Sequence, residues 1–437
     1  MTGKEASSLA SEFKAELMDS VIPFWEKHSL DKEEGGYFSC LDRDGSVFDT
    51  DKFAWMQGRE LWCFSKLYNE VEPRPEWLDA ARLGAAFLSD YGRAENGDYY
   101  FSLDRVGRPL VQPYNIFSDC FCAAGFVEYA RAELKAAGGA SVRGGEGGQG
   151  AELAVGPAIP GAEWARAEAT RLFYRIQERK ADPKGAWTKQ ISANRPQRAM
   201  AMSMTQLWFA EVFQGILPAS ELEAMAAESA RAVLMVHLDE DKKALFERVM
   251  ADGSRPQGMD GRLLSPGHAL ETLFLLLNAV CKLKGYPSWP PAPSRLSAAE
   301  SLLPEGWDFG RVCEAMIWSA ERGWDDKFGG LYYYRDYEGR PLDKLESDMK
   351  LWWVHVEAIS AFLLAYRLTG DARYEAWFRR IKDWTWARFR DPEYGEWFGY
   401  LDRRGEPALS LKGGKWKGMF HLPRALLYWI DICGQLS

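Results

Sequence analysis

The chain of 437 residues lacks the patterns that mark several large classes of protein. It has no apolar run of about 18 residues, so no membrane span is expected. Its net charge of −9 argues against a polyanionic partner such as nucleic acid, because phosphates are bound by basic surfaces. No GxGxxG motif follows a predicted strand and no GxxxxGK[ST] loop is present, so the sequence gives no signal for a phosphate-bound cofactor.

Cysteines are few and scattered. The seven include no CxxC pair that would indicate zinc, and they predict buried free thiols in a reducing cytosol. The first 17 residues lack the apolar core of a signal peptide and favour a cytoplasmic protein. Tryptophan, in contrast, is abundant at 19 residues. Such an excess fills a large core or lines a carbohydrate site, where flat rings cover the apolar faces of sugars.

A short pattern recurs along the chain: an aromatic strand, a turn that ends in glycine, and a short return strand, which together predict a β-hairpin. Copies begin at Gly35, Gly97, Gly329 and Gly395, and weaker ones at Ala244 and Gly185. Two of the intervals between copies are longer than the others. Both contain Gly-, Pro- and Ala-rich sequence that is typical of loop insertions, near 136–161 and near 287–304. Without these insertions the chain divides into six units of roughly 60 residues.

Between the hairpins lie pairs of segments whose apolar residues recur at helical spacing, for example 75–91, 118–137 and 349–370. Each unit is therefore predicted to be a helical hairpin plus a β-hairpin, and such units must stack to bury their apolar faces. Six of them predict an all-α fold, an (α/α)6 barrel, formed as one catalytic domain over residues 1–437. Polar residues of the inner helices and their loops would converge in a funnel at one end.

Only five histidines are present. His28 and His237 lie in charged helical segments and are predicted to be surface or packing residues. His268 follows Ser265 and Pro266, a pair that signals the start of a helix. His421 lies just before Pro423, at another predicted helix start.

Acidic and basic residues near these histidines are further candidates. Glu271 follows His268 by three residues and shares its helix face. Glu357 lies in a strongly apolar helical segment, where a carboxylate needs a partner or a function. His355, two residues earlier, points to the other side of the same helix. Arg59 is a lone cation among aromatic residues, and it either serves the chemistry or bridges a carboxylate.

Two other sites can be built from these residues. His268, Glu271, Glu357 and His421 contain an HxxE pair that can supply two metal ligands, but no third ligand has a recognisable spacing, so no metal is predicted. Glu271 and Glu357 alone are the kind of carboxylate pair that a glycosidase uses. This second alternative stays open at the level of sequence.

Five segments together resemble one known family, the N-acylglucosamine 2-epimerase (renin-binding protein) family: FWEKHSLDKEEGGYFSCLDRDG, WMQGRELW, SPGHALE, LWWVHVEA and RDPEYGEWFGYLDRRGEPALSLKGGKWKGMFHLPR. The resemblance covers nearly the whole chain apart from the two insertions. It implies an (α/α)6 barrel, in agreement with the six units. It also implies interconversion of N-acetylglucosamine and N-acetylmannosamine.

The resemblance also implies which residues act. The five catalytic positions of the family correspond to His268, His421, Glu271, Glu357 and Arg59, and all five are present. Mammalian members have a cysteine where Met419 stands, so a thiol there is not expected to be essential. Related cellobiose 2-epimerases and aldose–ketose isomerases carry a histidine in the segment that here contains Met202 and Met204. The lack of that histidine, together with the LKGGxxKGxFHxPR form of the last segment, favours the N-acyl amino-sugar branch.

The predicted reaction is inversion at C2 of the open-chain sugar without a required cofactor. Two histidines would act on opposite faces of C2, one removing the proton and one returning it through an enolate. Arg59 is predicted to bind the developing O1 oxyanion. Glu271, Glu357 or both would orient an imidazole or assist ring opening. The residues predicted to contact the sugar are Trp55, Gln57, Trp352 and Trp397, with core packing as the equal alternative for each tryptophan.

The family further implies a homodimer and a nucleotide such as ATP as an activator that is not consumed. Two rival functions remain. One is an epimerase or isomerase of non-acylated sugars such as mannose or cellobiose, and the other is a non-catalytic member that binds a protein. Turnover of N-acetylmannosamine would separate these possibilities.

Overall fold

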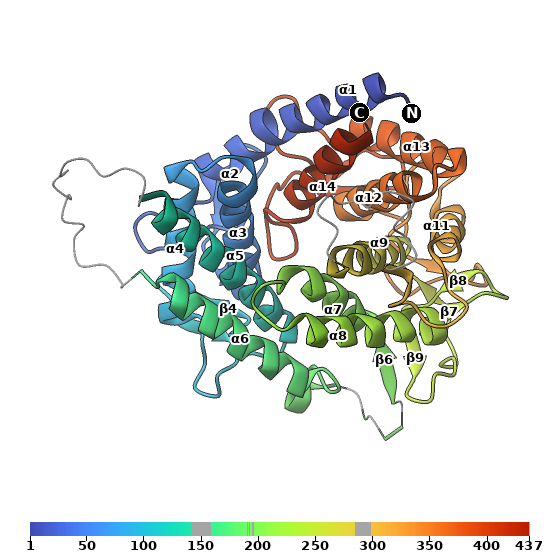
Figure 1. The fold of residues 1–437 in the computed structure, drawn as a ribbon, viewed down its shortest axis with the longest axis horizontal. Helices are drawn as coiled ribbons and strands as arrows, with labels where there is room; N and C mark the ends of the chain where they lie inside the picture. Colours follow the sequence, from blue (N-terminus) through green and yellow to red (C-terminus); the bar gives the residue numbers. More distant parts are fainter. Residues whose placement is uncertain (141–158, 190, 192, 195, 285–298, 437) are drawn as a thin grey trace. The chain divides into compact units, whose positions relative to one another are not determined.

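The computed structural model describes residues 1–437 except 141–158, 190, 192, 195, 285–298 and 437 (Figure 1). Most of both predicted insertions lies outside the described residues. The described flanks show that helix α5 (Ile116–Ala140) extends into the range predicted as the first insertion, so residues 136–140 are helical rather than loop. In the described part of the chain, no helix is both long and apolar enough to cross a bilayer.

The chain forms two compact units. The larger unit comprises Met1–Pro23, Lys189–Ser410 and His421–Ser437, and the smaller unit comprises Phe24–Thr188 and Leu411–Phe420. Whether the two make up one domain, as the repeats predict, stays a prediction.

The smaller unit contains two helix pairs, α3 with α4 and α5 with α6, and α3 also packs on α5. Its helices are α2 (Ile22–His28, shared with the larger unit), α3 (Ala54–Lys66), α4 (Pro75–Tyr91), α5 (Ile116–Ala140) and α6 (Ala162–Arg179), with a π-helical turn at Leu67–Val71 and a 3-10 turn at Gly185–Trp187. Its strands are β1 (Cys40–Leu41), β2 (Val47–Asp49), β3 (Lys52–Phe53), β4 (Ser102–Leu103) and β5 (Pro109–Val111).

The larger unit runs in Figure 1 from α7 in green to α14 in red, and α1 in blue belongs to it. Its helices are α1 (Gly3–Ala15), α7 (Ala201–Val212), α8 (Ala219–Ala232), α9 (Pro266–Leu283), α11 (Phe309–Gly323), α12 (Trp352–Thr369), α13 (Ala372–Arg388) and α14 (His421–Leu436), with π-helical turns at Glu16–Val21 and Val233–His237. Its strands are β6 (Gln197–Ala199), β7 (Leu238–Asp239), β8 (Ala244–Leu245), β9 (Arg248–Met250), β10 (Leu263–Leu264), β11 (Arg335–Asp336), β12 (Lys350–Leu351), β13 (Tyr400–Leu401) and β14 (Pro407–Leu409).

Helices of the larger unit divide into inner and outer members. Helices α7, α9, α12 and α14 pack on one another in that order, and each has its own partner: α8, α11, α13 and α1. The inner helix α12 buries 15 of its 18 residues. The outer helix α13 buries only Tyr374, Phe378, Ile381 and Thr385, a single apolar stripe at helical spacing. The four pairs here and the two in the smaller unit account for the six predicted helical hairpins, with α1 completing the pair of the last helix.

Three of the predicted β-hairpins are present, β1–β2, β4–β5 and β13–β14. The prediction of a hairpin from Gly329 is wrong. Strand β11 pairs with β10, and the backbone N–H groups of Tyr333 and Tyr334 donate to the carbonyls of Met349 and Ser347. The copy from Ala244 is also split, since β8 pairs with β7 and β9 with β6. The fragment from Gly185 forms a 3-10 turn instead of a strand.

A buried ion pair fixes the start of α3 in the smaller unit. Lys52 Nζ lies 2.9 Å from Asp31 Oδ2 and donates to the carbonyl of Gly35 at 2.6 Å. Arg105 Nε also donates to Asp31 Oδ2, at 2.9 Å. Burial raises the pKa of Asp31, but the bonds from Arg105 and Lys52 outweigh it and lower that pKa to about 2.

The larger unit repeats this arrangement at the start of α12. Lys350 Nζ lies 3.3 Å from Asp325 Oδ2, and Arg403 Nε donates to the same oxygen at 2.9 Å. Lys350 and Arg403 are separated by the same number of residues as Lys52 and Arg105. Burial, partly offset by Asp325, lowers the pKa of Lys350 to about 8. The sequence repeat therefore has a physical counterpart, a buried lysine that anchors the first turn of an inner helix.

Removal of the Lys52 ammonium tests this anchor. Lys52→Met leaves the Asp31 carboxylate buried with one cation fewer, and we expect the free energy of unfolding to fall by about 3 kcal/mol or more in urea titrations near neutral pH. Lys242→Met is the control, because its pair with Asp239 is exposed and contributes little. Equal stability of the two variants would contradict the anchoring role.

Glu60 on α3 is a second buried ionisable group, and its Oε1 has no hydrogen-bond partner among the described residues. Burial, partly offset by Ser29, raises the pKa of Glu60 from 4.5 to about 8. At a pH between 4.5 and about 8, Glu60 is ionised in the unfolded chain but protonated in the folded chain. The free energy of unfolding therefore falls as the pH rises through this range, and it levels off above about 8.

Glu60→Gln removes this titration. We expect the thermal midpoint of the wild type to decline between pH 5 and 8 by more than that of Glu60→Gln, measured by circular dichroism across the range. Parallel pH profiles for the two proteins would show that Glu60 is not held neutral.

Candidate active site

His268 lies in the first turn of α9, as predicted. Ser265 caps the helix, its Oγ accepting the backbone N–H of His268 at 3.4 Å, and Pro266 occupies the first helical position. The ring Nδ1 of His268 lies 3.1 Å from both carboxylate oxygens of Glu247. Burial lowers the pKa of His268, but the carboxylates of Glu247 and Glu271 outweigh it, so that pKa is raised above 6.5.

Glu247 is a site residue that the sequence interpretation missed, because only a long-range contact joins it to His268. It lies between β8 and β9, where its carbonyl accepts the N–H of Met200 and its own N–H donates to the carbonyl of Leu263. These bonds tie its backbone to the segments that lead into α7 and α9. The carboxylate is thus held at a fixed place beside the imidazole.

His421 is the first residue of α14 and meets the carboxylate of Glu357 from α12. Its Nδ1 lies 2.7 Å from Glu357 Oε1. The same oxygen accepts a hydrogen bond of 2.6 Å from Arg424 Nη2. A carboxylate that is paired with a guanidinium is ionised and can only accept hydrogen bonds. The hydrogen between Glu357 and His421 therefore lies on Nδ1 of His421.

Arg424 links the two predicted glutamates. Its Nη2 donates to Glu271 Oε1 at 2.7 Å as well as to Glu357, and its side chain is 2% exposed. Burial lowers the pKa of Arg424, but the two carboxylates outweigh it and raise that pKa above its ordinary value. One feature of the sequence points to Arg424: it follows His421 by three residues and so shares its helix face.

Both histidines pack against one indole, that of Trp353 on α12. The ring centroid of Trp353 lies 4.9 Å from that of His268 and 5.9 Å from that of His421. The ring of Trp352 lies edge-on to that of His421, with 6.3 Å between the two ring centroids. The structure therefore brings together four of the five predicted catalytic residues, from α9, α12 and α14 of the larger unit.

The cluster also contains a possible metal-ligand set, since ligand atoms of Glu271, Glu357 and His421 lie within 4.8 Å of one another. Arg424 already donates hydrogen bonds to both carboxylates of this set. A metal ion bound here would have to displace the buried guanidinium of Arg424. The two carboxylates therefore fit their ion pairs with Arg424 better than they fit a metal ion.

Gln57, predicted to contact the sugar, is engaged elsewhere. Its Oε1 accepts the N–H of Tyr37 and its Nε2 donates to the carbonyl of Tyr37, each at 2.8 Å. His355 does the equivalent in the larger unit, where its Nε2 accepts the N–H of Leu331 at 2.9 Å. Burial lowers the pKa of His355 to about 3. Both side chains thus fix a turn, which favours a packing role for Gln57.

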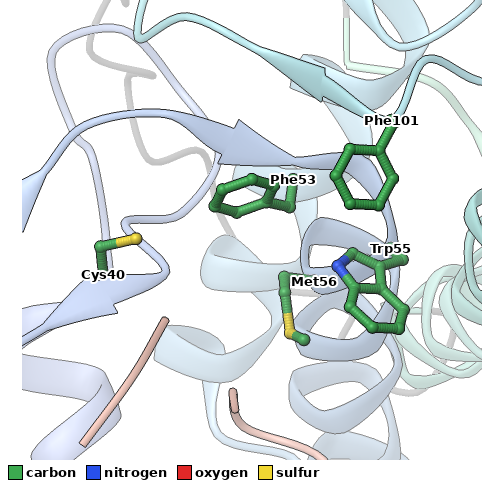
Figure 2. Close-up of a cluster of buried hydrophobic side chains, with 5 residues drawn as sticks. All are labelled: Cys40, Phe53, Trp55, Met56 and Phe101. Carbon is green, nitrogen blue, oxygen red and sulfur yellow. The ribbon is translucent and has the colours of Figure 1, made fainter. Parts of the chain in front are cut away.

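Arg59 and Trp55 belong to the smaller unit. The Arg59 guanidinium lies 4.0 Å from the ring centroid of Phe121 and 4.7 Å from that of Trp55, and its side chain contacts aromatic faces. Trp55 packs in a cluster of buried side chains that includes Met56 and Phe101 (Figure 2). The roles predicted for Arg59 and Trp55 in catalysis and sugar binding stay predictions.

Trp397, the remaining predicted sugar contact, lies inside the core of the larger unit. It has no exposed surface, and its Nε1 donates to Glu16 Oε1 at 2.9 Å. Its ring stacks on Phe389. This placement favours core packing, the alternative stated for each tryptophan. His28 and His237 are packing residues, as predicted: His28 lies against Phe24, and His237 is buried with its Nδ1 2.9 Å from the carbonyl of Phe246.

Comparison with known proteins places these residues in a family. The family model for N-acylglucosamine 2-epimerase (GlcNAc 2-epimerase) matches residues 36–142 and 151–425. The chain is 35% identical to the N-acylglucosamine 2-epimerase of Mus musculus over 96% of its own length and 90% of that protein. It is 36% identical to the Bos taurus enzyme of the same name, over 97% and 90%.

A solved structure supports the fold. The cellobiose 2-epimerase of Spirochaeta thermophila superposes with a TM-score of 0.74 at 22% identity, covering 99% of this chain and 98% of that one. This likeness confirms the predicted fold class, an all-α (α/α)6 barrel. Taken with the sequence matches, it shows that the chain belongs to the N-acylglucosamine 2-epimerase family and is an epimerase.

Proposed function

We propose that this enzyme interconverts N-acetylglucosamine and N-acetylmannosamine by removing and returning the C2 proton, without a required cofactor. The observation that carries the proposal is the pair His268 and His421, which pack on one indole while each presents Nδ1 to a carboxylate. The names of the relatives, which match nearly the whole chain, support the N-acylated substrate.

The proposed chemistry starts from the open-chain aldehyde. One imidazole takes the proton from C2, and the electron pair of the broken C–H bond forms the C1–C2 double bond of an enolate with its charge on O1. The other imidazole gives a proton to the opposite face of C2, and the electron pair returns to form the new C–H bond. Histidine suits both steps because it titrates near neutral pH. The acetamido group at C2 blocks the simple route to a ketose.

Arg424 supports this chemistry through Glu357. With the hydrogen of His421 on Nδ1, the neutral ring has its lone pair on Nε2, the nitrogen that would face the sugar. Glu271 acts through Arg424 and is a positioning residue, because its carboxylate holds the guanidinium that in turn holds Glu357. Activation by a nucleotide and formation of a homodimer remain predictions from the family.

Exchange of the C2 proton tests the proposal directly. In D2O the wild type should convert N-acetylmannosamine to N-acetylglucosamine with deuterium at C2, followed by proton NMR. His268→Asn and His421→Asn should each slow epimerisation by about 100-fold or more. His28→Asn, a histidine outside the site, is the matched control and should retain full activity. Full exchange in both site variants would eliminate the two-base scheme, and turnover of mannose or cellobiose alone would assign a different substrate.

Gly267 provides a second test, because it lets Trp353 lie beside His268. A Cβ atom at this position would lie 2.8 Å from ring atom Cζ3 of Trp353 and from Cγ2 of Val354, closer than carbon atoms pack. Gly267→Ala should displace the indole that supports both imidazoles and lower kcat about tenfold or more.

Gly434→Ala on α14 is the matched control, since a Cβ there meets no atom within 4 Å. We expect it to leave kcat unchanged. Unchanged kcat in Gly267→Ala, with a wild-type thermal midpoint, would show that Trp353 does not set the positions of the histidines.

A further inference from the structure

The two histidines of the site have carboxylate partners in different electrostatic settings. Glu357 shares one oxygen between His421 and the guanidinium of Arg424. Glu247 offers both oxygens to His268, and among the described residues no lysine or arginine lies within ion-pair distance of it. Among the described residues, the carboxylate of Glu247 is therefore paired with a single group, the imidazole of His268.

Groups from the other elements around His268 do not cancel this charge. Glu271 on α9 is paired with Arg424, so its charge is largely balanced. Trp353 on α12 contributes a neutral ring. Tyr333, which packs on Trp353, has its pKa raised, chiefly by burial and also by the nearby Glu346 and Glu247, and is neutral as well. Glu346 is a further carboxylate on the segment after β11. The two charges that raise the pKa of His268 are those of Glu247 and Glu271, and of these two only Glu247 is bonded to the ring.

The backbone on both sides of this pair is fixed. Glu247 is bonded to Met200 and Leu263, and His268 lies in the capped first turn of α9. The residue before Glu247 is held too, since Phe246 bonds His237 through both its N–H and its carbonyl. A carboxylate held this firmly selects one ring orientation and one tautomer of its histidine, as in catalytic sites that orient an imidazole.

We propose that Glu247 is a positioning residue for epimerisation: it fixes the hydrogen of His268 on Nδ1, turns Nε2 toward the sugar and holds the ring as the imidazolium that returns the proton to C2. This inference rests on the proposed function for its chemical step. It assigns His268 the donor role in the resting enzyme. Once its Nε2–H bond breaks and the proton reaches C2, the ring is neutral, and it regains a proton from water, to which its side chain is 26% exposed.

Titration of the histidines tests the pair without any sugar. The chain has five histidines, so labelling their Cε1 carbons gives a spectrum in which each can be assigned by substitution. In the wild type, the midpoint of His268 should lie above 6.5, and in Glu247→Gln it should move to lower pH while the midpoints of His28 and His421 stay in place. A midpoint below 6.5 in the wild type, or one that does not respond to Glu247→Gln, would overturn the proposal.

Kinetics test the consequence for the reaction. Glu247→Gln keeps an acceptor for Nδ1 but loses the charge, and we expect kcat to fall roughly 100-fold with little change in KM. Glu247→Asp keeps the charge and should restore part of the loss. Glu338→Gln is the control, because this carboxylate of the larger unit is exposed and pairs with Arg340. Equal kcat in Glu247→Gln and the wild type would contradict the proposal.

Deuterium exchange separates a role at His268 from a general structural role. In Glu247→Gln, the epimer whose C2 proton faces His421 should still exchange that proton with D2O, while inversion falls for both epimers. Equal loss of exchange for both epimers would show that Glu247 supports the whole site and not His268 alone. If the wild type turns over no amino sugar, the proposed function fails. The titration of His268 still decides, independently of that outcome, whether Glu247 keeps the imidazole protonated.

Discussion

The bridge from Arg424 to Glu271 and Glu357 is the interaction on which the rest of the site depends. It joins α14, α9 and α12, three inner helices of the larger unit, through one guanidinium that is almost fully buried. Two carboxylates side by side in a poorly solvated place would repel each other and take up protons. With Arg424 between them, they remain acceptors, and Glu357 can hold the imidazole of His421.

The repeated architecture explains why the site forms where it does. Helices α3, α7, α9 and α12 each begin just after a short strand. In two of these repeats, a buried lysine at that point pairs with an aspartate that also bonds an arginine. The first turn of an inner helix is thereby a rigid place for a functional side chain. Trp353 and Glu357 follow Lys350 at the same spacings at which Trp55 and Arg59 follow Lys52. The chain uses one scaffold position for different chemistry in different repeats.

Local signals in the sequence predicted much of this. Apolar spacing located the helices, the Ser265–Pro266 pair predicted the start of α9, and a carboxylate in an apolar helix marked Glu357. What could not be predicted depends on contacts between distant segments. Glu247 meets His268 only through the pairing of strands, and Gln57 and Trp397 are held by Tyr37 and Glu16. The partners of β11 and β9 were predicted wrongly for the same reason. A strand of two or three residues has too few alternating apolar and polar positions to specify the strand it pairs with.

The central claim is that the two imidazoles address opposite faces of one carbon. A crystal structure with an open-chain alditol of N-acetylmannosamine, which cannot react, would test it most directly. The account predicts that C2 of the bound alditol lies between Nε2 of His268 and Nε2 of His421, with Nδ1 of each ring still bonded to Glu247 and Glu357. An alditol bound with both rings on one face of C2, or with only one ring near it, would contradict the account.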